Sequence, residues 1–381
     1  MTTEYDAVVV GLGGAGSSAA YHLAASGLSV LGLEQFGPVH ARGSSHGRSR
    51  IYRTAYFEGP EYVPLVQRAQ ELWRELQRRT GERIIHPTGG LMIGRPDAPT
   101  VSGARRTAES CGLEHAVLDP GDVARRFPQF VLAEDEVALW DPNAGALFPE
   151  NCVRCHAAEA VGVGAELHYG EPVKGWSASG TSVVARTRSA EYRARSLVIT
   201  SGPWTTHVVP DLELPLEIER QFMLWFPASD PALVAPDRMP VFLWDRGPEE
   251  HSYGLPDFGD GVKVGSWNGK ITRTPEEVDR AFSEADARPV RRFVARALRG
   301  VRPQEIAHTS CLYTNAPDHH FLIGRHPDHE NVVVVSACSG HGFKFTSVLG
   351  EVITRLVRGE PTGYDLAEFD PGRFRPSAGQ V

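Results

Sequence analysis

Six residues near the N-terminus restrict the fold of this chain more than any other feature. Gly11-Leu12-Gly13-Gly14-Ala15-Gly16 matches the pattern G-x-G-x-x-G and directly follows an apolar run from Tyr5 to Val10. Residues with helical spacing come next, and a second apolar run ends at Glu34, 18 residues beyond Gly16. This order of strand, glycine turn, helix and strand predicts a Rossmann-like β-α-β unit that binds a dinucleotide.

Each part of this pattern has a physical role. Gly11 allows the tight turn, Gly13 lets the backbone approach a pyrophosphate, and Gly16 permits close packing of the helix. The start of the helix offers free N–H groups and a positive dipole end to an anion. Glu34 is placed to accept hydrogen bonds from both ribose hydroxyls, and a glutamate disfavours a 2'-phosphate. The pattern therefore favours FAD or NAD over a tight β-α turn that binds nothing.

Rossmann-like segments recur far along the chain, around 196–204 and 331–358, with β-rich sequence between them. A chain of 381 residues is long enough for two domains. We therefore predict a mixed α/β fold in which a Rossmann-like FAD-binding domain (1–85, 146–215 and 315–381) carries an inserted antiparallel-sheet substrate domain (86–145 and 216–314). We also expect helices over 60–80 and about 275–299, and a loop over 141–148.

Composition argues against several classes of protein. No apolar run approaches the 18 residues that a membrane helix needs, and a net charge of -8 disfavours a nucleic-acid binder. The N-terminus shows no secretory signal, and five cysteines are too few for a disulfide framework, so we expect a cytoplasmic protein.

One motif is misleading. Cys152-Val153-Arg154-Cys155-His156 matches the haem attachment pattern C-x-x-C-H, but haem attachment needs export. No second Cys/His pair at zinc spacing accompanies it, and the two histidines of DHHF (318–321) have no metal partner pattern. We therefore predict no metal site.

The loop that follows the second predicted strand is rich in basic residues. His40, Arg42, His46, Arg48, Arg50 and Arg53 fall within 14 residues. A solvated loop or a nucleic-acid patch would explain such charge, but the chain is acidic overall and the loop lacks interleaved aromatic residues. A cationic loop downstream of the nucleotide motif is well placed beside a flavin ring.

Several stretches carry a resemblance that spans nearly the whole chain. They are VVVGLGGAGSSAAYHLA, GSSHGRSRIYRTAY, EYVPLVQRAQELWREL, NAGALFPENCVR, SCLYTNAPDHHFLIG and SGHGFKFTSVLGE. The chain resembles the monomeric sarcosine oxidase and N-methyltryptophan oxidase family of flavoprotein amine oxidases, which have a D-amino-acid-oxidase-like fold. This resemblance implies a monomer that binds a small amino acid and oxygen.

The resemblance also implies roles for residues around the cofactor. Cys311 matches the cysteine that binds FAD covalently through an 8α-thioether, although a free buried cysteine is more often a small hydrophobe. His46 and Arg50 match a pair near the flavin, and Gly340 and His341 match the turn beside it. Ser44 and Gly342 are further cofactor-binding candidates.

The substrate side follows from the same resemblance. Arg53 and Lys344 match two cations that hold a substrate carboxylate, and Lys263 matches the lysine that activates oxygen. Tyr253 and Tyr313 match two active-site tyrosines. Of the 39 Lys and Arg residues only four are lysines, and two of these fall where the family has lysine.

One position departs from the family. Trp267 stands where sarcosine-specific members have histidine, which changes both volume and hydrogen bonding. The expected reaction is oxidation of the C–N bond of a secondary amino acid to an imine that water hydrolyses, with release of hydrogen peroxide. A cyclic imino acid oxidase, an aromatic amino acid tailoring oxidase and a non-catalytic flavin-binding protein remain as alternatives.

Overall fold

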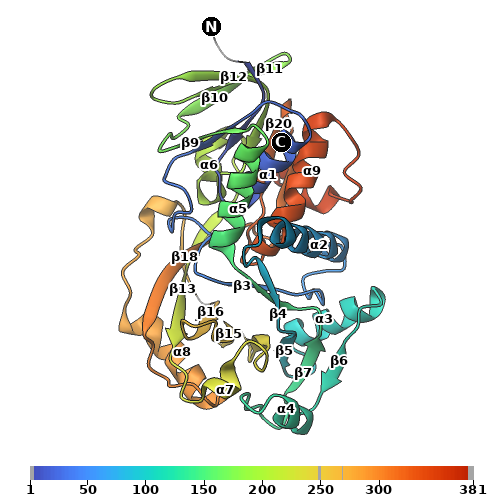
Figure 1. Cartoon of the computed structure of the whole chain (residues 1–381), viewed down its shortest axis with the longest axis vertical. Coiled ribbons are helices and arrows are strands. Elements are labelled where there is room, and N and C mark those ends of the chain that lie inside the picture. The colour runs from blue at the N-terminus through green and yellow to red at the C-terminus, as the bar shows by residue number, and fades with distance from the viewer. Residues whose placement is uncertain (1–3, 248–249, 268, 376–381) are drawn as a thin grey trace, which may run out of the picture.

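The structure is a computed structural model that describes residues 4–247, 250–267 and 269–375. In this part of the chain, two large β-sheets lie at opposite ends of the long axis, and a small third sheet lies between them (Figure 1). The site described below lies where these layers meet.

The first sheet contains the N-terminal β-α-β unit. Strand β12 is parallel to β1 along one edge, while its other edge pairs first with β11 and then with β20. The order β12-β1-β2-β9 is parallel throughout. The strands are β1 (Glu4–Val10), β2 (Val30–Glu34), β9 (Glu166–Tyr169), β10 (Gly175–Ser179), β11 (Ser182–Arg186), β12 (Glu191–Ile199), β19 (Leu322–His326) and β20 (His329–Ser336). Segments of the chain that are far apart in sequence thus form one sheet.

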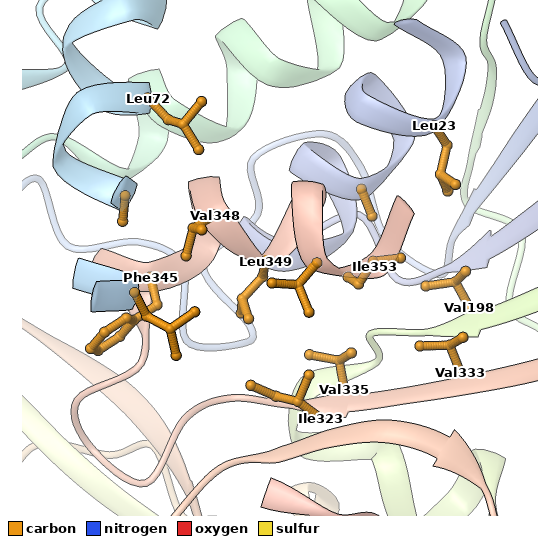
Figure 2. Packing of buried hydrophobic residues seen from close by; sticks show 14 of the residues in the cluster. Leu23, Leu72, Val198, Ile323, Val333, Val335, Phe345, Val348, Leu349 and Ile353 are labelled. Carbon is orange, nitrogen blue, oxygen red and sulfur yellow. The ribbon is translucent and has the colours of Figure 1, made fainter. Parts of the chain in front are cut away.

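Helices cover this sheet and bury its valine-rich strands. Helix α1 (Gly14–Ala25) packs against α9 (Thr346–Arg358) and α5 (Pro149–Gly162), and α2 (Tyr62–Thr80) packs against α9. Figure 2 shows Leu349 and Ile353 of α9 facing Val333 and Val335 of β20. The alanines and serines of α1 allow this close approach, and a Cβ on Gly350 of α9 would overlap the side chains of His22 and Ser18.

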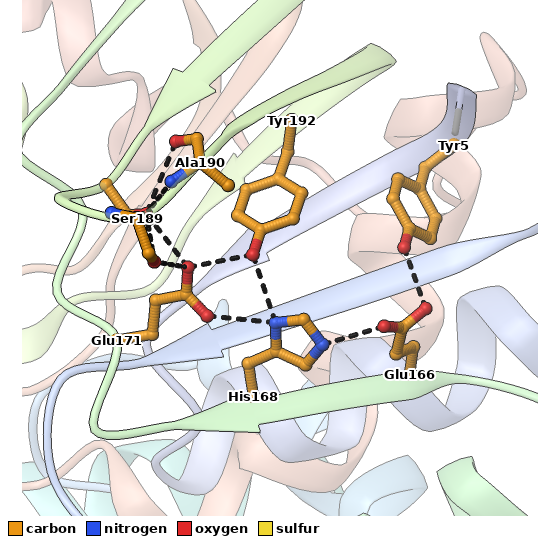
Figure 3. A network of polar contacts seen from close by, with 8 residues as sticks. Tyr5, Glu166, His168, Glu171, Ser189, Ala190 and Tyr192 are labelled. Atoms are coloured by element: carbon orange, nitrogen blue, oxygen red, sulfur yellow. Dashed lines mark hydrogen bonds and ion pairs between the residues drawn. The ribbon is translucent and has the colours of Figure 1, made fainter. Parts of the chain in front are cut away.

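A polar network ties three strands at the edge of this sheet. His168 lies between the carboxylates of Glu166 and Glu171, at 2.7 and 2.9 Å (Figure 3). Tyr5 of β1 donates to Glu166, and Tyr192 of β12 donates to Glu171. The network therefore joins β9 to β1 and β12 through partly exposed side chains.

The second sheet is largely antiparallel and has the order β17-β13-β16-β15-β14-β5-β7-β6, with β18 on the other edge of β13. The strands are β5 (Gly90–Gly94), β6 (Ala116–Leu118), β7 (Val137–Asp141), β13 (Glu217–Phe226), β14 (Val241–Asp245), β15 (His251–Leu255), β16 (Val262–Ser266), β17 (Lys270–Thr272) and β18 (Ala307–Asn315). Its short helices are α3 (Pro99–Ser110), α4 (Pro120–Arg126) and α7 (Pro231–Val234). Helix α8 (Glu284–Ala297) packs Val290, Phe293 and Val294 into the core of this layer.

The third sheet has the order β3-β8-β4, with β3 (Arg50–Tyr52), β4 (Ile85–Pro87) and the central β8 (Gly145–Leu147). The expectation of a loop over 141–148 is therefore wrong for β8, whose residues pair with strands on both sides. The helix expected over about 275–299 is also shorter. A 3-10 turn, Pro275–Glu277, comes first, and α8 begins at Glu284 because Ser283 and Asp286 form a capping box.

The remaining short elements are α6 (Thr205–Val208) and the 3-10 turns at 202–204, 210–212, 343–345, 367–369 and 371–374. Among the described residues, no helix combines the length and apolar character needed to cross a membrane. The mixed α/β architecture predicted from the sequence is confirmed.

Candidate active site

A cavity of about 820 Å³ extends from the glycine motif of the first sheet to the strands of the second. It is lined by most of the residues that the sequence singles out. These are Gly11, Gly13, Glu34, Ser44, Arg50, Arg53, Tyr253, Lys263, Trp267, Cys311, Tyr313, Gly340, His341, Gly342 and Lys344. Gly16 and His46 do not line it. Such a volume lies at the upper end of the range for small-molecule and cofactor sites.

The glycine motif is built for a close backbone turn at one end of this cavity. Gly11 has φ +90°, and a Cβ there would lie 2.8 Å from the Thr200 carbonyl oxygen. A Cβ on Gly16 would overlap the Gly11 carbonyl oxygen and lie 2.6 Å from Thr200 Oγ1. Gly13 precedes α1, and the start of this helix lines the cavity, where the Gly14 N–H donates to Ser45 Oγ at 3.0 Å.

Glu34 ends β2 at the same place. Its Oε2 accepts the Leu12 N–H at 2.9 Å, and its Oε1 accepts the Phe36 N–H at 2.9 Å and lies 3.3 Å from His40 Nε2. These bonds hold the carboxylate at the cavity wall, where it retains further lone pairs for ribose hydroxyls. Tight glycine turns, helix N–H groups and a fixed carboxylate fit the pyrophosphate and ribose of a dinucleotide.

Cys311 lies further along the cavity, on β18. Its Sγ is 3.2 Å from Arg50 Nη2. The same guanidinium donates to the carbonyl oxygens of Ser44 and Ser49, each at 3.0 Å, and its Nη1 lies 3.2 Å from Met223 Sδ. Arg50 therefore presents fixed positive charge to the buried Cys311 thiol.

Lys263 of β16 is fully buried at the cavity wall, with an exposed fraction of 1%. Its Nζ donates to the carbonyl oxygens of Gly47 and Ser49, at 2.9 and 2.5 Å. Burial holds the pKa of Lys263 well below its ordinary value, and the positive charge of Arg50 lowers it further. Hydrogen bonds from Arg50 and Lys263 to its carbonyl oxygens therefore hold the loop from 43 to 49 in place.

A second pair of cations forms another end of the cavity. Arg53 follows β3, and its Nη2 pairs with both oxygens of Glu58, at 2.5 and 2.7 Å. Burial tends to lower the pKa of Arg53, but the charge and hydrogen bond of Glu58, together with Tyr56 and Asp141, outweigh burial and keep this pKa above its ordinary value. The guanidinium also lies 4.2 and 4.4 Å from the ring centres of Tyr56 and Phe57.

Lys344 completes this pair. It lies in the 3-10 turn before α9, where its Nζ donates to the His341 carbonyl oxygen and, at 3.3 Å, to Tyr56 Oη. Burial and then Arg53 hold the pKa of Lys344 well below its ordinary value. His341 is fixed as well, because Nε2 faces the His319 carbonyl oxygen at 3.0 Å and Nδ1 faces Tyr56 Oη at 2.6 Å. A carbonyl only accepts, so Nε2 of His341 carries the proton.

Aromatic side chains line the space between the two cationic groups. Burial raises the pKa of both Tyr253 and Tyr313, so their hydroxyls stay protonated and able to donate. Gly340 has φ +76°, and a Cβ there would lie 3.2 Å from the Tyr313 ring. The Trp267 and Tyr253 rings stack, with centres 6.4 Å apart.

His46 is buried next to Arg50 and Lys263 but does not itself line the cavity. Burial lowers its pKa to about 3, and the charges of Arg50 and Lys263 add to this effect. His46 is therefore a neutral, buried member of the basic loop, and its predicted place near the flavin stays a prediction.

Three features of the site have no signal in the sequence. The Glu58 carboxylate pairs with the Arg53 guanidinium. Cys338 is a second thiol at the cavity wall, and Asp245 pairs with His251 at this wall. His320 of the DHHF segment also has carboxylate neighbours, because Glu61 and Glu368 each offer an oxygen within 4.8 Å of the other two ligand atoms. Only the folded chain brings these residues together.

The glycine turn, the fixed Glu34 and the long cavity all fit a flavin dinucleotide. The comparison with protein families decides between FAD and NAD. The model of the FAD dependent oxidoreductase family, DAO, matches residues 6–356. This chain belongs to that family. FAD is therefore the cofactor of this oxidoreductase, and the glycine turn, the start of α1 and Glu34 are the groups suited to hold it.

Relatives of this oxidoreductase extend along its whole length. It is 42% identical to monomeric sarcosine oxidase of Streptomyces avermitilis over 379 residues, which cover 98% of this chain and 99% of the relative. It is 32% identical to N-methyl-L-tryptophan oxidase of Citrobacter koseri, with 97% and 99% of the two chains covered. The family resemblance predicted from the sequence is confirmed.

A solved structure of similar fold is NikD, described as an unusual amino acid oxidase essential for nikkomycin biosynthesis. The TM-score is 0.86 at 24% identity, and 97% of this chain and 98% of that chain are covered. L-proline dehydrogenase from P. horikoshii has a TM-score of 0.83 at 20% identity, with 98% of each chain covered. At these identities the likeness is one of fold.

Proposed function

We propose that this chain oxidises the C–N bond of N-substituted (secondary) amino acids and passes the electrons to oxygen. The observation that carries the proposal is the meeting of two buried cations, Arg53 and Lys344, with Lys263 and two protonated tyrosines in one cavity. The names of the relatives, sarcosine oxidase and N-methyl-L-tryptophan oxidase, support the same substrate class. The substrate loses two hydrogens to give an imine, which water hydrolyses, while oxygen becomes hydrogen peroxide.

Arg53 and Lys344 are suited to hold the substrate carboxylate. A guanidinium fork can hold a carboxylate through two parallel hydrogen bonds. Glu58 already engages one nitrogen of this fork, since Arg53 Nη2 lies 2.5 and 2.7 Å from its two carboxylate oxygens. A substrate must therefore exchange with Glu58 or share Arg53 with it. Fixing the carboxylate orients the amine and its C–H bond, which removes much of the entropic barrier to reaction.

Lys263 is the residue proposed to promote the reaction with oxygen. FAD, when bound, supplies the two-electron acceptor that the side chains lack. A buried cation held by two carbonyl oxygens provides fixed positive charge where superoxide would form, without reorganising at that moment. This role requires the protonated amine, although burial favours the neutral form.

Cys311 is the residue that we propose to bind FAD covalently. The support is its place in the cavity and the contact of its Sγ with Arg50. Acid precipitation of the purified protein should leave the yellow colour in the pellet, and Cys311→Ala should release it to the supernatant. Free colour from the wild type would contradict the linkage but leave the function intact.

The functional proposal is tested by measuring hydrogen peroxide from a panel of amines. Sarcosine and N-methyl-L-tryptophan represent secondary amino acids, L-proline a cyclic imino acid, and dimethylamine a secondary amine without a carboxylate. We expect peroxide from one or more of the carboxylates and none from dimethylamine, because only a carboxylate engages Arg53 and Lys344. Preference for L-proline or N-methyl-L-tryptophan would favour the cyclic or aromatic alternative, and the aromatic wall at Trp267 supports the latter. Peroxide from none of them would contradict the proposal.

We also propose that the chain is a monomer, which light scattering of the purified protein tests directly. A cytoplasmic location remains a prediction from the sequence.

A further inference from the structure

The cavity contains a second polar pair that the proposed chemistry does not use. Asp245 ends β14 and His251 begins β15, and the antiparallel register places the two residues opposite each other. His251 Nε2 lies 2.7 Å from Asp245 Oδ1, and both residues line the cavity. A carboxylate–imidazole pair at the wall of a substrate cavity needs an explanation, because burying its charge costs free energy.

The state of this pair follows from its hydrogen bonds. Asp245 is 3% exposed and accepts the Gly247 N–H at 3.1 Å and the Thr100 N–H at 3.4 Å. Burial tends to raise the pKa of Asp245, but the bonds from His251 and the Gly247 N–H outweigh it and lower this pKa to about 2. Asp245 is therefore a carboxylate that only accepts, so Nε2 of His251 carries a proton.

The second ring nitrogen of His251 is then available to a ligand. When the imidazole is neutral and Nε2 is protonated, Nδ1 is an acceptor. Within residues 4–247, 250–267 and 269–375, no donor makes a hydrogen bond to Nδ1. The His251 side chain is 26% exposed, so a group that enters the cavity can reach this ring.

Aromatic contacts connect this pair to the proposed carboxylate site. The ring centre of Trp267 is 5.4 Å from that of His251 and 6.4 Å from that of Phe57. The Arg53 guanidinium lies 4.4 Å from the Phe57 ring centre. A series of contacts therefore connects His251 to Arg53 through the rings of Trp267 and Phe57.

We propose that Asp245 and His251 form a specificity subsite in which His251 Nδ1 accepts a hydrogen bond from the distal N–H or O–H group of an aromatic substrate side chain. Phe57 and Trp267 contact the ring, and Asp245 acts as a positioning residue that fixes the tautomer and orientation of His251. The inference rests on the proposed function, because the same substrate places its carboxylate on Arg53 and Lys344. Sarcosine has no side chain to reach this subsite, so the preferred substrate is larger than sarcosine.

The test compares substrates that differ by one donor, with the holoenzyme. The pairs are N-methyl-L-tyrosine with N-methyl-L-phenylalanine, and N-methyl-L-tryptophan with its 1-methylindole derivative. In at least one pair the donor-bearing member should have a kcat/KM higher by roughly 10-fold, the range expected for one buried hydrogen bond. His251→Phe should bring the ratio of kcat/KM between the donor-bearing substrate and its partner close to one. His251→Gln, whose amide oxygen can accept a hydrogen bond, should restore part of this ratio.

The network in Figure 3 offers a matched control. His168 is also held by carboxylates, but it does not line the cavity, so His168→Phe should leave both ratios unchanged. Asp245→Asn should lower the ratio through a higher KM for the donor-bearing substrate, with flavin content and thermal midpoint measured to confirm folding. The Gln and Asn variants keep the test decisive if the Phe variant does not fold.

Two failures are distinguishable. Oxidation of both members of each pair at equal kcat/KM by the wild type, or equal ratios in wild type and His251 variants, would overturn the subsite while the proposed function stands. A wild-type flavoprotein that is reduced by none of these substrates, nor by sarcosine or L-proline, would overturn the proposed function, and the subsite with it.

Discussion

Gly16 provides the sharpest test of how the nucleotide turn is built. In Gly16→Ala the new Cβ would overlap the Gly11 carbonyl oxygen and lie 2.6 Å from Thr200 Oγ1. Ordinary contacts of a Cβ begin at 3.4 Å, so the first turn of α1 must move away from β1 and from Thr200, by more than half an ångström. The displaced N–H groups are those of the helix start that lines the cavity.

This displacement affects both the free energy of unfolding and the affinity for FAD. Overpacking of this kind costs about 1–3 kcal/mol, and the better helix propensity of alanine returns up to about 1 kcal/mol. We expect a net loss of about 1–2 kcal/mol in the free energy of unfolding, and a weakening of FAD binding by roughly 100-fold, since a misplacement near 1 Å has effects of that size.

The assay is FAD binding followed by flavin fluorescence, together with urea unfolding, both in a Cys311→Ala background so that binding is reversible. Gly162→Ala is the control, because Gly162 lies in α5 and a Cβ added there would meet no atom within 4 Å. The control should bind FAD like its parent. A Gly16→Ala protein that binds FAD within threefold of its parent and unfolds at the same urea concentration would refute this account of the turn.

Three further predictions concern charge. Lys263→Met should slow flavin reoxidation at least about 100-fold and change reduction by substrate much less, as stopped-flow absorbance measures; equal effects on both steps would contradict its role. Glu58→Gln should tighten binding of acetate, a simple carboxylate, by roughly 10-fold, because Arg53 loses its competing partner; unchanged binding in a spectral titration would show that Glu58 does not compete. The folded chain should lose stability as pH falls below about 6.5, because burial depresses the pKa of His46 and His156 in the native state while the unfolded chain takes up the protons. His46 alone should remove about 2 kcal/mol by pH 5, and His156 should add to this loss, so flat urea midpoints between pH 7.5 and 5 would contradict their neutral burial.

The nucleotide half of the fold could be predicted because its signals are local. A strand, a glycine turn and a helix stand next to one another from Tyr5 to Ala25. The segments predicted around 196–204 and 331–358 contain the end of β12, which pairs with β1, and most of β20, which pairs with β12. The short strand β8 could not be predicted, since its three residues become a strand only by pairing with β3 and β4 from other parts of the chain. The start of α8 depends on the Ser283 cap and not on the apolar pattern that predicted a longer helix.

The site, too, has residues that could be predicted from the sequence and contacts that could not. The family resemblance selects Lys263, Arg53 and Lys344, and the structure brings them into one cavity. It gives no sign that Glu58 holds Arg53, because that contact depends on how the loop between them folds back. The pairing of Asp245 with His251 is likewise set by strand register, and the burial of His46 by the packing beneath Arg50.

As proposed above, this FAD-dependent oxidoreductase takes electrons from secondary amino acids held by Arg53 and Lys344. The most direct measurement is anaerobic mixing of the purified holoenzyme with sarcosine, N-methyl-L-tryptophan, L-proline and dimethylamine while flavin absorbance is followed. One or more of the three carboxylates should bleach the flavin, and dimethylamine should not. A flavin that no member bleaches, or that dimethylamine bleaches as fast as the amino acids, would contradict the proposal.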